Sequence, residues 1–124
     1  MRQITREELE GMERVQRLNL VNSLPGYKPA NLIGTRSAHG APNLAIVSSV
    51  LHLSSSPATV GFMQRPTTVP RDTYANLTAT GFFTINHVHR EFTDRAHYTS
   101  AKFAPEESEF QLTGLTEEYL GGFQ

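Results

Sequence analysis

Hydroxyl and arginine side chains concentrate in short polar segments of this chain. These segments are residues 48–49, 54–56, 65–68, 71–73 and 99–102. A phosphate dianion binds best where several donors converge, and the first turn of a helix adds backbone N–H groups. The segments therefore indicate a phosphate site, although solvated loops have the same composition. Asp72 argues against it, because a carboxylate that caps a helix there would occupy the same N–H groups and repel phosphate.

Five histidines in a chain without cysteine raise the question of a metal site. His87 and His89 are expected on one face of a strand, and His52 and His97 are further candidate ligands. No acidic residue accompanies the pair at regular spacing, so a pair on a sheet surface is the commoner explanation. We predict no metal ligand. No Ser-His-Asp arrangement can be read from spacing alone, so a hydrolase is less favoured than a metal protein.

The N-terminal region has the pattern of one amphipathic helix. Thr5 and Glu8 have the spacing of a capping box. Apolar residues follow at three-residue steps, namely Leu9, Met12, Val15, Leu18 and Val21. The pattern predicts a helix over about residues 5–23, which the pair Pro25-Gly26 ends.

From residue 30 onward the pattern is that of short strands. We predict strands at residues 31–35, 43–50, 58–63 and 82–88, the first two joined by a hairpin turn at His39 and Gly40. The second strand has an apolar face that carries Leu44 and Ile46. Its other face is mixed and can hold a ligand. The mixed face consists of Asn43, Ala45, Val47 and Ser49.

Two short helices interrupt the predicted strands. One spans residues 72–80, with Asp72 as its N-cap and Gly81 as a left-handed stop, and the other spans residues 91–99. A polar loop is predicted to open at Pro105 before residues 110–112, and a further element to begin at residues 117–124. Because no βαβ rhythm is present, we predict a mainly β fold with short helices, either an antiparallel sheet or a small barrel.

Composition narrows the possible partners. The chain has 124 residues and a formal charge of −1, which excludes the broad cationic field of a non-specific nucleic-acid binder. The N-terminus is too polar for a signal peptide, and no run approaches the roughly 18 apolar residues of a membrane span. The common nucleotide, zinc-protease and esterase motifs are absent from the sequence. We predict a cytoplasmic protein with no nucleic-acid or membrane partner.

Six segments together resemble the flavin reductase-like, flavoredoxin-type family. They are LPGYKPANLIGTR (24–36), NLAIVSS (43–49), RP (65–66), RDTYANL (71–77), FTINHV (83–88) and AHYTSAKF (96–103). The order and spacing of the segments are more specific than any one of them. The resemblance implies an FMN-binding split β-barrel that forms a homodimer, with flavin near the subunit interface and NADH or NADPH as the reductant.

The resemblance also implies which residues bind the cofactor. The flavin ring would lie against the strand at 43–49, with Asn43, Ala45 and Ile46 at its polar edge. Ser48 and Ser49 would reach the ribityl chain or the phosphate, and Arg65, Arg71 and Thr73 would contact the phosphate. Residues that would line the site or the dimer seam are His97, Thr99, Ser100 and Lys102.

Members of this family usually continue for several tens of residues beyond the segment that matches 108–116. The resemblance therefore implies one domain over 1–124, with a helix at about 5–23 and a barrel portion at about 30–124 that is incomplete at its C-terminus. The leading hypothesis is an oxidoreductase in which hydride passes from the nicotinamide to flavin N5 and onward to an acceptor, which can be a protein. The alternatives are a non-enzymatic FMN-binding electron carrier, an inactive fragment, and a histidine-based metal protein.

Overall fold

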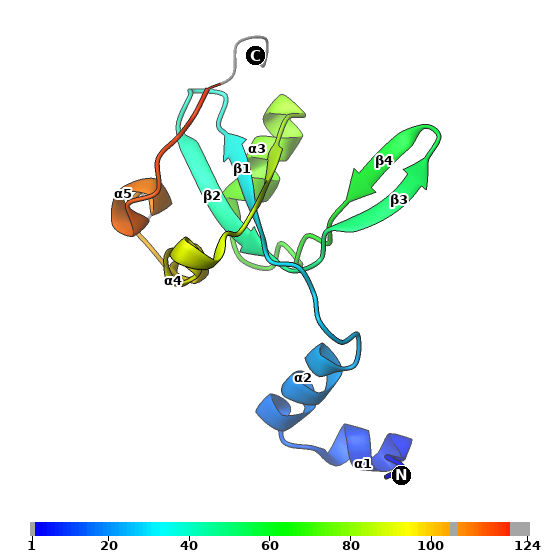
Figure 1. Ribbon diagram of the computed structural model, residues 1–124. Helices are drawn as coiled ribbons and strands as arrows, with labels where there is room; N and C mark the ends of the chain where they lie inside the picture. Colours follow the sequence, from blue (N-terminus) through cyan, green and yellow to red (C-terminus); the bar gives the residue numbers. More distant parts are fainter. Residues whose placement is uncertain (1, 105–106, 120–124) are drawn as a thin grey trace.

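A three-stranded antiparallel sheet forms the centre of the molecule. The computed structural model describes residues 2–104 and 107–119. Strands β1 (Asn31–Arg36), β2 (Pro42–Val47) and β5 (Thr84–His87) pair in the order β2-β1-β5 (Figure 1). The predicted hairpin between the first two strands is confirmed, and Gly40 adopts a positive φ of 90° in its turn.

A second hairpin projects from this sheet. Strands β3 (Leu51–Ser55) and β4 (Ala58–Gly61) pair only with each other, and the described residues do not join the two sheets into one closed barrel (Figure 1). The predicted strand 43–50 is therefore too long, and β3 was not predicted. The cause lies at Ser49, whose hydroxyl accepts a bond from Met63 N at 3.0 Å and donates to Met63 O at 3.3 Å. This side-chain link closes the base of the hairpin where β2 has ended.

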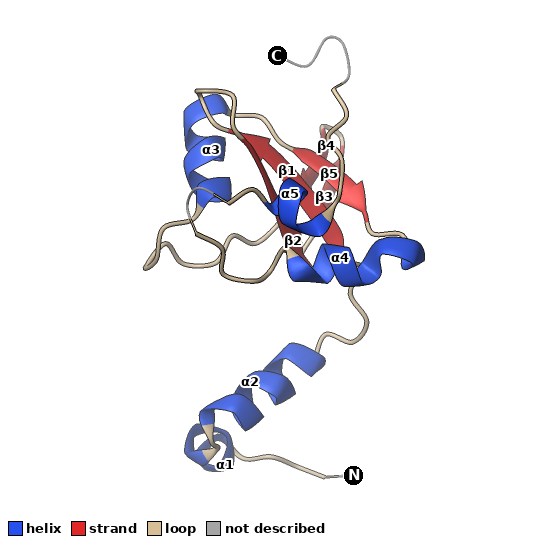
Figure 2. Cartoon of the chain, turned by 90° about the vertical axis from the view of Figure 1, so that its left-hand side faces the viewer, coloured by secondary structure: helices blue, strands red, loops and turns tan. Residues whose placement is uncertain are grey.

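Helices cover both faces of the central sheet. Helix α3 (Asp72–Thr80) lies on one side, and α4 (Thr93–Tyr98) and α5 (Glu109–Thr113) lie on the other (Figures 1 and 2). Gly81 ends α3 at a φ of 74°, as predicted. The predicted N-cap was wrong, because Arg71 holds that position and no side chain caps the helix.

Two further expectations about the C-terminal half need correction. The helix predicted at 91–99 is a 3-10 turn, η1 (Arg90–Phe92), followed by α4, and the segment predicted to follow a polar loop at 110–112 is part of α5. Within that loop, residues 105–106 lie outside the described residues, as do residues 120–124 of the last predicted element.

The apolar core lies between the sheet and the α4–α5 side. Leu32, Leu44 and Ala96 are buried there. Partly buried apolar residues surround them, namely Ile46, Val88, Phe92, Phe110 and Leu115. Leu44 and Ile46 thus share one apolar face, as the alternation along β2 predicts.

A buried polar network fixes α3 to the other face of the sheet. The Asn43 amide donates to the hydroxyl of Thr35 and to that of Thr73, both at 3.0 Å, and the Asn76 amide donates to Thr35 at 3.1 Å. All four residues are buried. Because an unpaired buried polar group is costly, the mixed face of β2 is held in register with α3 by this network.

The N-terminal region forms an arm of two helices, α1 (Arg6–Gly11) and α2 (Arg14–Ser23), where one helix was predicted. The predicted capping box at Thr5 and Glu8 is present. The break follows from Glu13, whose carboxylate accepts from the N–H groups of Val15 and Gln16 at 2.8 and 3.1 Å and so starts a second helix. The arm lies away from the sheet, and none of the residues of its two helices is buried (Figures 1 and 2).

The network between β2 and α3 predicts a non-additive effect on stability. Asn43→Leu removes the amide donor of the buried Thr73 hydroxyl and one of the two amide donors of Thr35, and it should lower the unfolding free energy by about 2 kcal/mol. Thr73→Val leaves one amide hydrogen unpaired and should also destabilise. The double variant should cost clearly less than both single variants together, because each removes the group that the other leaves unpaired. Urea denaturation of the four proteins measures this coupling, and strictly additive losses would contradict it.

Candidate functional site

The outer edge of β2 is bonded by side chains rather than by another strand. The backbone N–H of Ile46 donates to Thr99 Oγ1 at 3.1 Å, and the Thr99 hydroxyl donates to Ala96 O at 2.8 Å. Two residues earlier, Leu44 N donates to Glu109 Oε2 in a longer contact of 3.5 Å. An edge strand exposes unpaired backbone donors, so these contacts position α4 and α5 along β2.

Glu109 at this edge has a carboxyl whose titration is shifted by burial. Burial raises the pKa of its carboxyl, the N–H groups of Glu109 and Leu44 oppose this effect, and the charge of Asp72 raises the pKa further. Thr73 at the start of α3 bonds to Asn43 of β2, and Glu109 at the start of α5 bonds to Leu44, the next residue of β2. The beginning of α3, the edge of β2 and the start of α5 therefore form one polar region.

The start of α3 leaves backbone donors available. No side chain caps this helix, so Asp72 does not occupy the first N–H groups as the sequence predicted. Arg71 is half-buried and donates from Nε to Pro66 O at 3.1 Å, which orders the loop before the helix. The first-turn N–H groups and the Arg71 guanidinium together can bind an anion, against the opposing charge of Asp72.

The structure brings together some of the predicted cofactor residues. Asn43 meets Thr73 inside the network on the α3 face, and the backbone of Ile46 meets Thr99 at the β2 edge. Ala45 lies half-buried between them in β2. The N–H groups of the Asn43 side chain and the Ile46 backbone thus bond to other residues of this chain. These two residues therefore stabilise the structure of the region.

Other predicted residues lie at the surface. Ser49 bonds to the backbone of Met63, and the Ser100 hydroxyl donates to His97 O at 2.7 Å. The exposed members of the predicted set are Ser48, Arg65, His97, Ser100 and Lys102. These five residues are accessible to a ligand or a partner.

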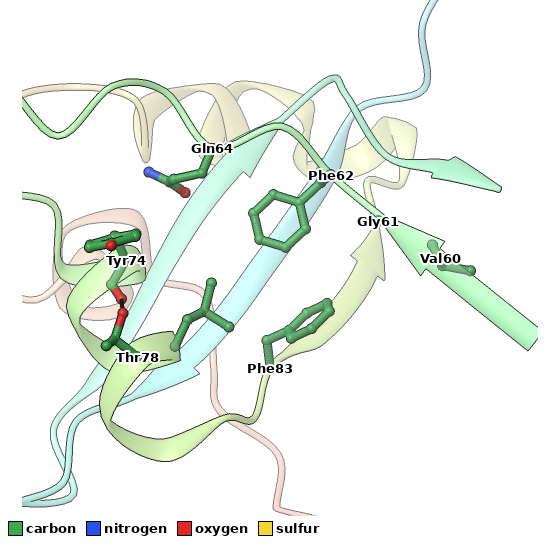
Figure 3. Close-up of a pocket in the computed structure, with 8 residues that line it drawn as sticks. Val60, Gly61, Phe62, Gln64, Tyr74, Thr78 and Phe83 are labelled. Atoms are coloured by element: carbon green, nitrogen blue, oxygen red, sulfur yellow. Dashed lines mark hydrogen bonds between the residues drawn. The ribbon is translucent and has the colours of Figure 1, made fainter. Parts of the chain in front are cut away.

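An apolar groove of about 450 Å³ lies beside α3 (Figure 3). Phe62 and Phe83 form one wall with ring centroids 5.4 Å apart, and α3 contributes the other wall. Its lining comprises Val60, Gly61, Phe62, Gln64, Tyr74, Leu77, Thr78 and Phe83. None of these residues is among those that the sequence predicted to bind the cofactor. The spacing of residues 74, 77 and 78 on one helix face was the available signal for the groove.

The histidines are dispersed. His87 ends β5, whereas His89 lies outside the strand and its Nδ1 accepts from Glu91 N at 3.4 Å. Among residues 2–104 and 107–119, no three His, Cys, Asp or Glu side chains lie close enough to hold a metal ion. The described part of the chain therefore gives the metal hypothesis no geometric support.

The fold and the polar region define a small antiparallel β domain with flanking helices and an uncapped helix start that suits an anionic ligand. A family model described as "Flavin reductase like domain" matches residues 27–121. The chain belongs to this flavin reductase-like family, and the resemblance inferred from the sequence segments is confirmed.

Solved structures support the assignment of the chain to this family. A crystal structure from Shewanella frigidimarina, assigned as a flavin reductase with a split barrel domain, matches with a TM-score of 0.93 and 46% identity over 99% of this chain and 61% of its own. Flavoredoxin of Desulfovibrio vulgaris matches with a TM-score of 0.64 and 28% identity over 72% of this chain and 47% of its own. The predicted class, sheets with short helices in a split-barrel fold, is confirmed.

Two further proteins also match this chain. Nitrilotriacetate monooxygenase component B from Bacillus cereus shares the fold, with a TM-score of 0.77 and 21% identity over 94% of this chain and 56% of its own. An uncharacterised protein of Halalkalibacterium halodurans is 30% identical over 92 residues, 73% of this chain and 44% of that protein. The chain thus spans roughly half the length of these relatives.

Within the part of the chain that the structure describes, no helix is long and apolar enough to cross a membrane.

Glu109 predicts a specific pH dependence of stability. Its pKa is raised in the folded state, so the native protein retains this proton to higher pH than the unfolded chain does. The unfolding free energy should therefore fall as pH rises from the ordinary pKa of a glutamic acid, about 4.3, through the raised pKa of Glu109. Glu109→Gln should remove this component while keeping an oxygen that accepts from Leu44 N. Urea denaturation at several pH values measures the difference between the two proteins.

The exposed residue Glu118 supplies a control with the same change of charge. Glu118→Gln should leave the pH profile of the unfolding free energy parallel to that of the wild type. A profile of Glu109→Gln that is equally parallel would contradict a raised pKa at Glu109.

Proposed function

We propose that this chain provides the FMN-binding framework of an oxidoreductase that transfers hydride from NADH or NADPH to flavin and onward to an acceptor. The observation that carries the proposal is the family match over residues 27–121, which includes the uncapped start of α3 and its adjacent arginines. The likeness to a protein assigned as a flavin reductase, at 46% identity, supports the same function. A homodimer is part of this proposal.

The residues around the start of α3 fit the phosphate of FMN. Arg71 carries guanidinium nitrogens beyond the Nε that bonds to Pro66 O, and Arg65 is exposed in the same loop. Charge-assisted donors and free helix N–H groups are the chemistry that a phosphate dianion requires. Ser48 and Lys102 are exposed donors that we assign to the same cofactor. Asp72 sets a limit on affinity, because its charge opposes that of the phosphate.

Several residues of the predicted cofactor set are buried or bonded within the chain. They would affect the cofactor indirectly, by holding the strand and helices around it in place. The amide of Asn43 and the hydroxyl of Thr99 already serve buried bonds that fix β2 against α3 and α4. A rigid strand is the support that a planar ring needs for a fixed orientation. Thr73, Ala45 and Ile46 are assigned to this same supporting role. We assign His97, Ser100 and Ser49 to the rim of the site.

Bound flavin supplies the hydride chemistry itself. The chain's part is to bind the anionic tail, orient the ring and leave access for the nicotinamide. No side-chain acid or base is demanded by this reaction, so no catalytic residue is assigned.

Arg71→Ala should weaken FMN binding much more than riboflavin binding, because only FMN carries the phosphate. Loss of a charge-assisted contact of about 1.5–3 kcal/mol corresponds to roughly 10- to 150-fold in the dissociation constant. Fluorescence titration with each flavin measures the two constants. Arg71→Lys should restore part of the difference, and Arg90→Ala, at an exposed position in η1, serves as a control. Equal losses for FMN and riboflavin would contradict the assignment of Arg71.

The likeness to flavoredoxin at 28% identity favours a second candidate, an FMN-binding electron carrier. The two candidates differ in the rate at which a nicotinamide reduces the bound flavin. Stopped-flow bleaching of the flavin absorbance by NADH and by NADPH should be fast and saturable for the proposed reductase. Slow, non-saturable bleaching with both nicotinamides would favour the carrier instead.

A further inference from the structure

Glu109 carries a half-buried carboxyl group that the proposed hydride transfer does not use. The carboxyl lies at the outer edge of β2, where Oε2 accepts the 3.5 Å contact from Leu44 N. The helix that carries it is fixed in place, because Phe110 packs against the apolar core and the hydroxyl of the buried Thr113 donates to Glu109 O at 2.6 Å. The backbone of Glu109 is therefore held at this edge.

No bonded cation neutralises this carboxylate. Among residues 2–104 and 107–119, Glu109 forms no ion pair. Strand β2 carries no charged residue, and the Arg95 guanidinium on α4 donates to Gly114 O at 3.1 Å instead. The other charged groups of α4 and of the segment that joins it to α5 are exposed, so solvent screens them. They are Asp94, His97, Lys102 and Glu107.

Two adjacent residues of β2 connect Glu109 to the start of α3. Asn43 bonds to Thr73 in the first turn of α3, and Leu44 bonds to Glu109. Burial raises the pKa of the Glu109 carboxyl, and the charge of Asp72 raises it further. A negative charge at the start of α3 therefore already opposes the ionisation of Glu109.

The phosphate of FMN would bring further negative charge to the same helix start. A phosphate monoester carries up to two charges, with a second pKa of about 6. Arg71 and the exposed Arg65 can neutralise the phosphate itself, but neither forms an ion pair with Glu109. Two unit charges roughly 10 Å apart near a protein surface change a binding constant on the order of 10-fold. An ionised Glu109 thus repels the phosphate, whereas a neutral one does not.

We propose that Glu109 makes FMN binding depend on pH: its neutral carboxyl allows the phosphate to bind at the start of α3, and its ionised carboxylate weakens that binding. This inference rests on the proposed function and adds a regulation of the same site. Coupling between two sites is reciprocal, so bound FMN favours the protonated form of Glu109. The protein therefore takes up part of a proton from solvent when FMN binds.

Fluorescence titration of the full chain with FMN at several pH values tests this coupling. The quantity to compare is the dissociation constant of the wild type divided by that of Glu109→Gln, because the ionisation of the phosphate affects both proteins and cancels in the ratio. The ratio should be near one below the ordinary pKa of a glutamic acid, about 4.3. It should rise on the order of 10-fold as pH passes through the raised pKa of Glu109.

Two controls separate charge from structure. Riboflavin carries no phosphate, so the same ratio measured with riboflavin should stay near one at every pH. Glu118→Gln removes a carboxylate at an exposed position outside the site and should give a ratio to the wild type that does not change with pH. Circular dichroism at each pH establishes that the proteins are folded.

Asp72 supplies a test that a merely structural role of Glu109 would not pass. Asp72→Asn removes the charge that opposes the ionisation of Glu109. The ratio between Asp72→Asn and Asp72→Asn/Glu109→Gln should therefore rise at a lower pH than the ratio in the wild-type background. An unchanged midpoint would contradict an electrostatic link between the start of α3 and Glu109.

The outcomes distinguish this inference from the proposed function. A ratio that stays at one across the pH range, while both proteins bind FMN, overturns the role of Glu109 and leaves the proposed function in place. A ratio that rises equally for FMN and riboflavin also overturns it, because the effect would then not act on the phosphate. Folded proteins that bind no FMN at any pH overturn the proposed function and this inference together.

Discussion

The unpaired outer edge of β2 is the constraint on which the rest of the structure depends. Backbone donors on this edge need partners, and Thr99 and Glu109 supply them from α4 and α5. These contacts bring the two helices over Leu44 and complete the apolar core on that face. On the opposite face, the amide of Asn43 fixes α3 and so determines where the uncapped helix start lies. One strand thereby positions α3, α4 and α5 around the candidate cofactor region.

The local features of the fold could be predicted from the sequence. The alternation along β2, the turn at Gly40 and the left-handed stop at Gly81 are each determined by neighbouring residues. The polar segments also indicated a phosphate site, and one of them contains Arg71. Family resemblance, based on the order of six segments, added the split-barrel class, which no periodicity would have given.

Two of the missed features depend on contacts distant in sequence. Strand β3 lies in a hairpin whose base is linked by the bonds between Ser49 and Met63, 14 residues apart. The role of Thr99 as a partner of Ile46 spans 53 residues. The N-cap prediction at Asp72 failed because Arg71 holds that position, where the adjacent loop bonds its side chain. Such pairings are set by tertiary structure, which a single sequence does not display.

The central claim is that this framework binds FMN, and the visible absorption spectrum of the purified chain tests it most directly. The spectrum is recorded before and after FMN is added and free dye is removed. The account predicts retained flavin bands near roughly 370 and 450 nm. A protein that is folded by circular dichroism but remains colourless after exposure to FMN would contradict the account.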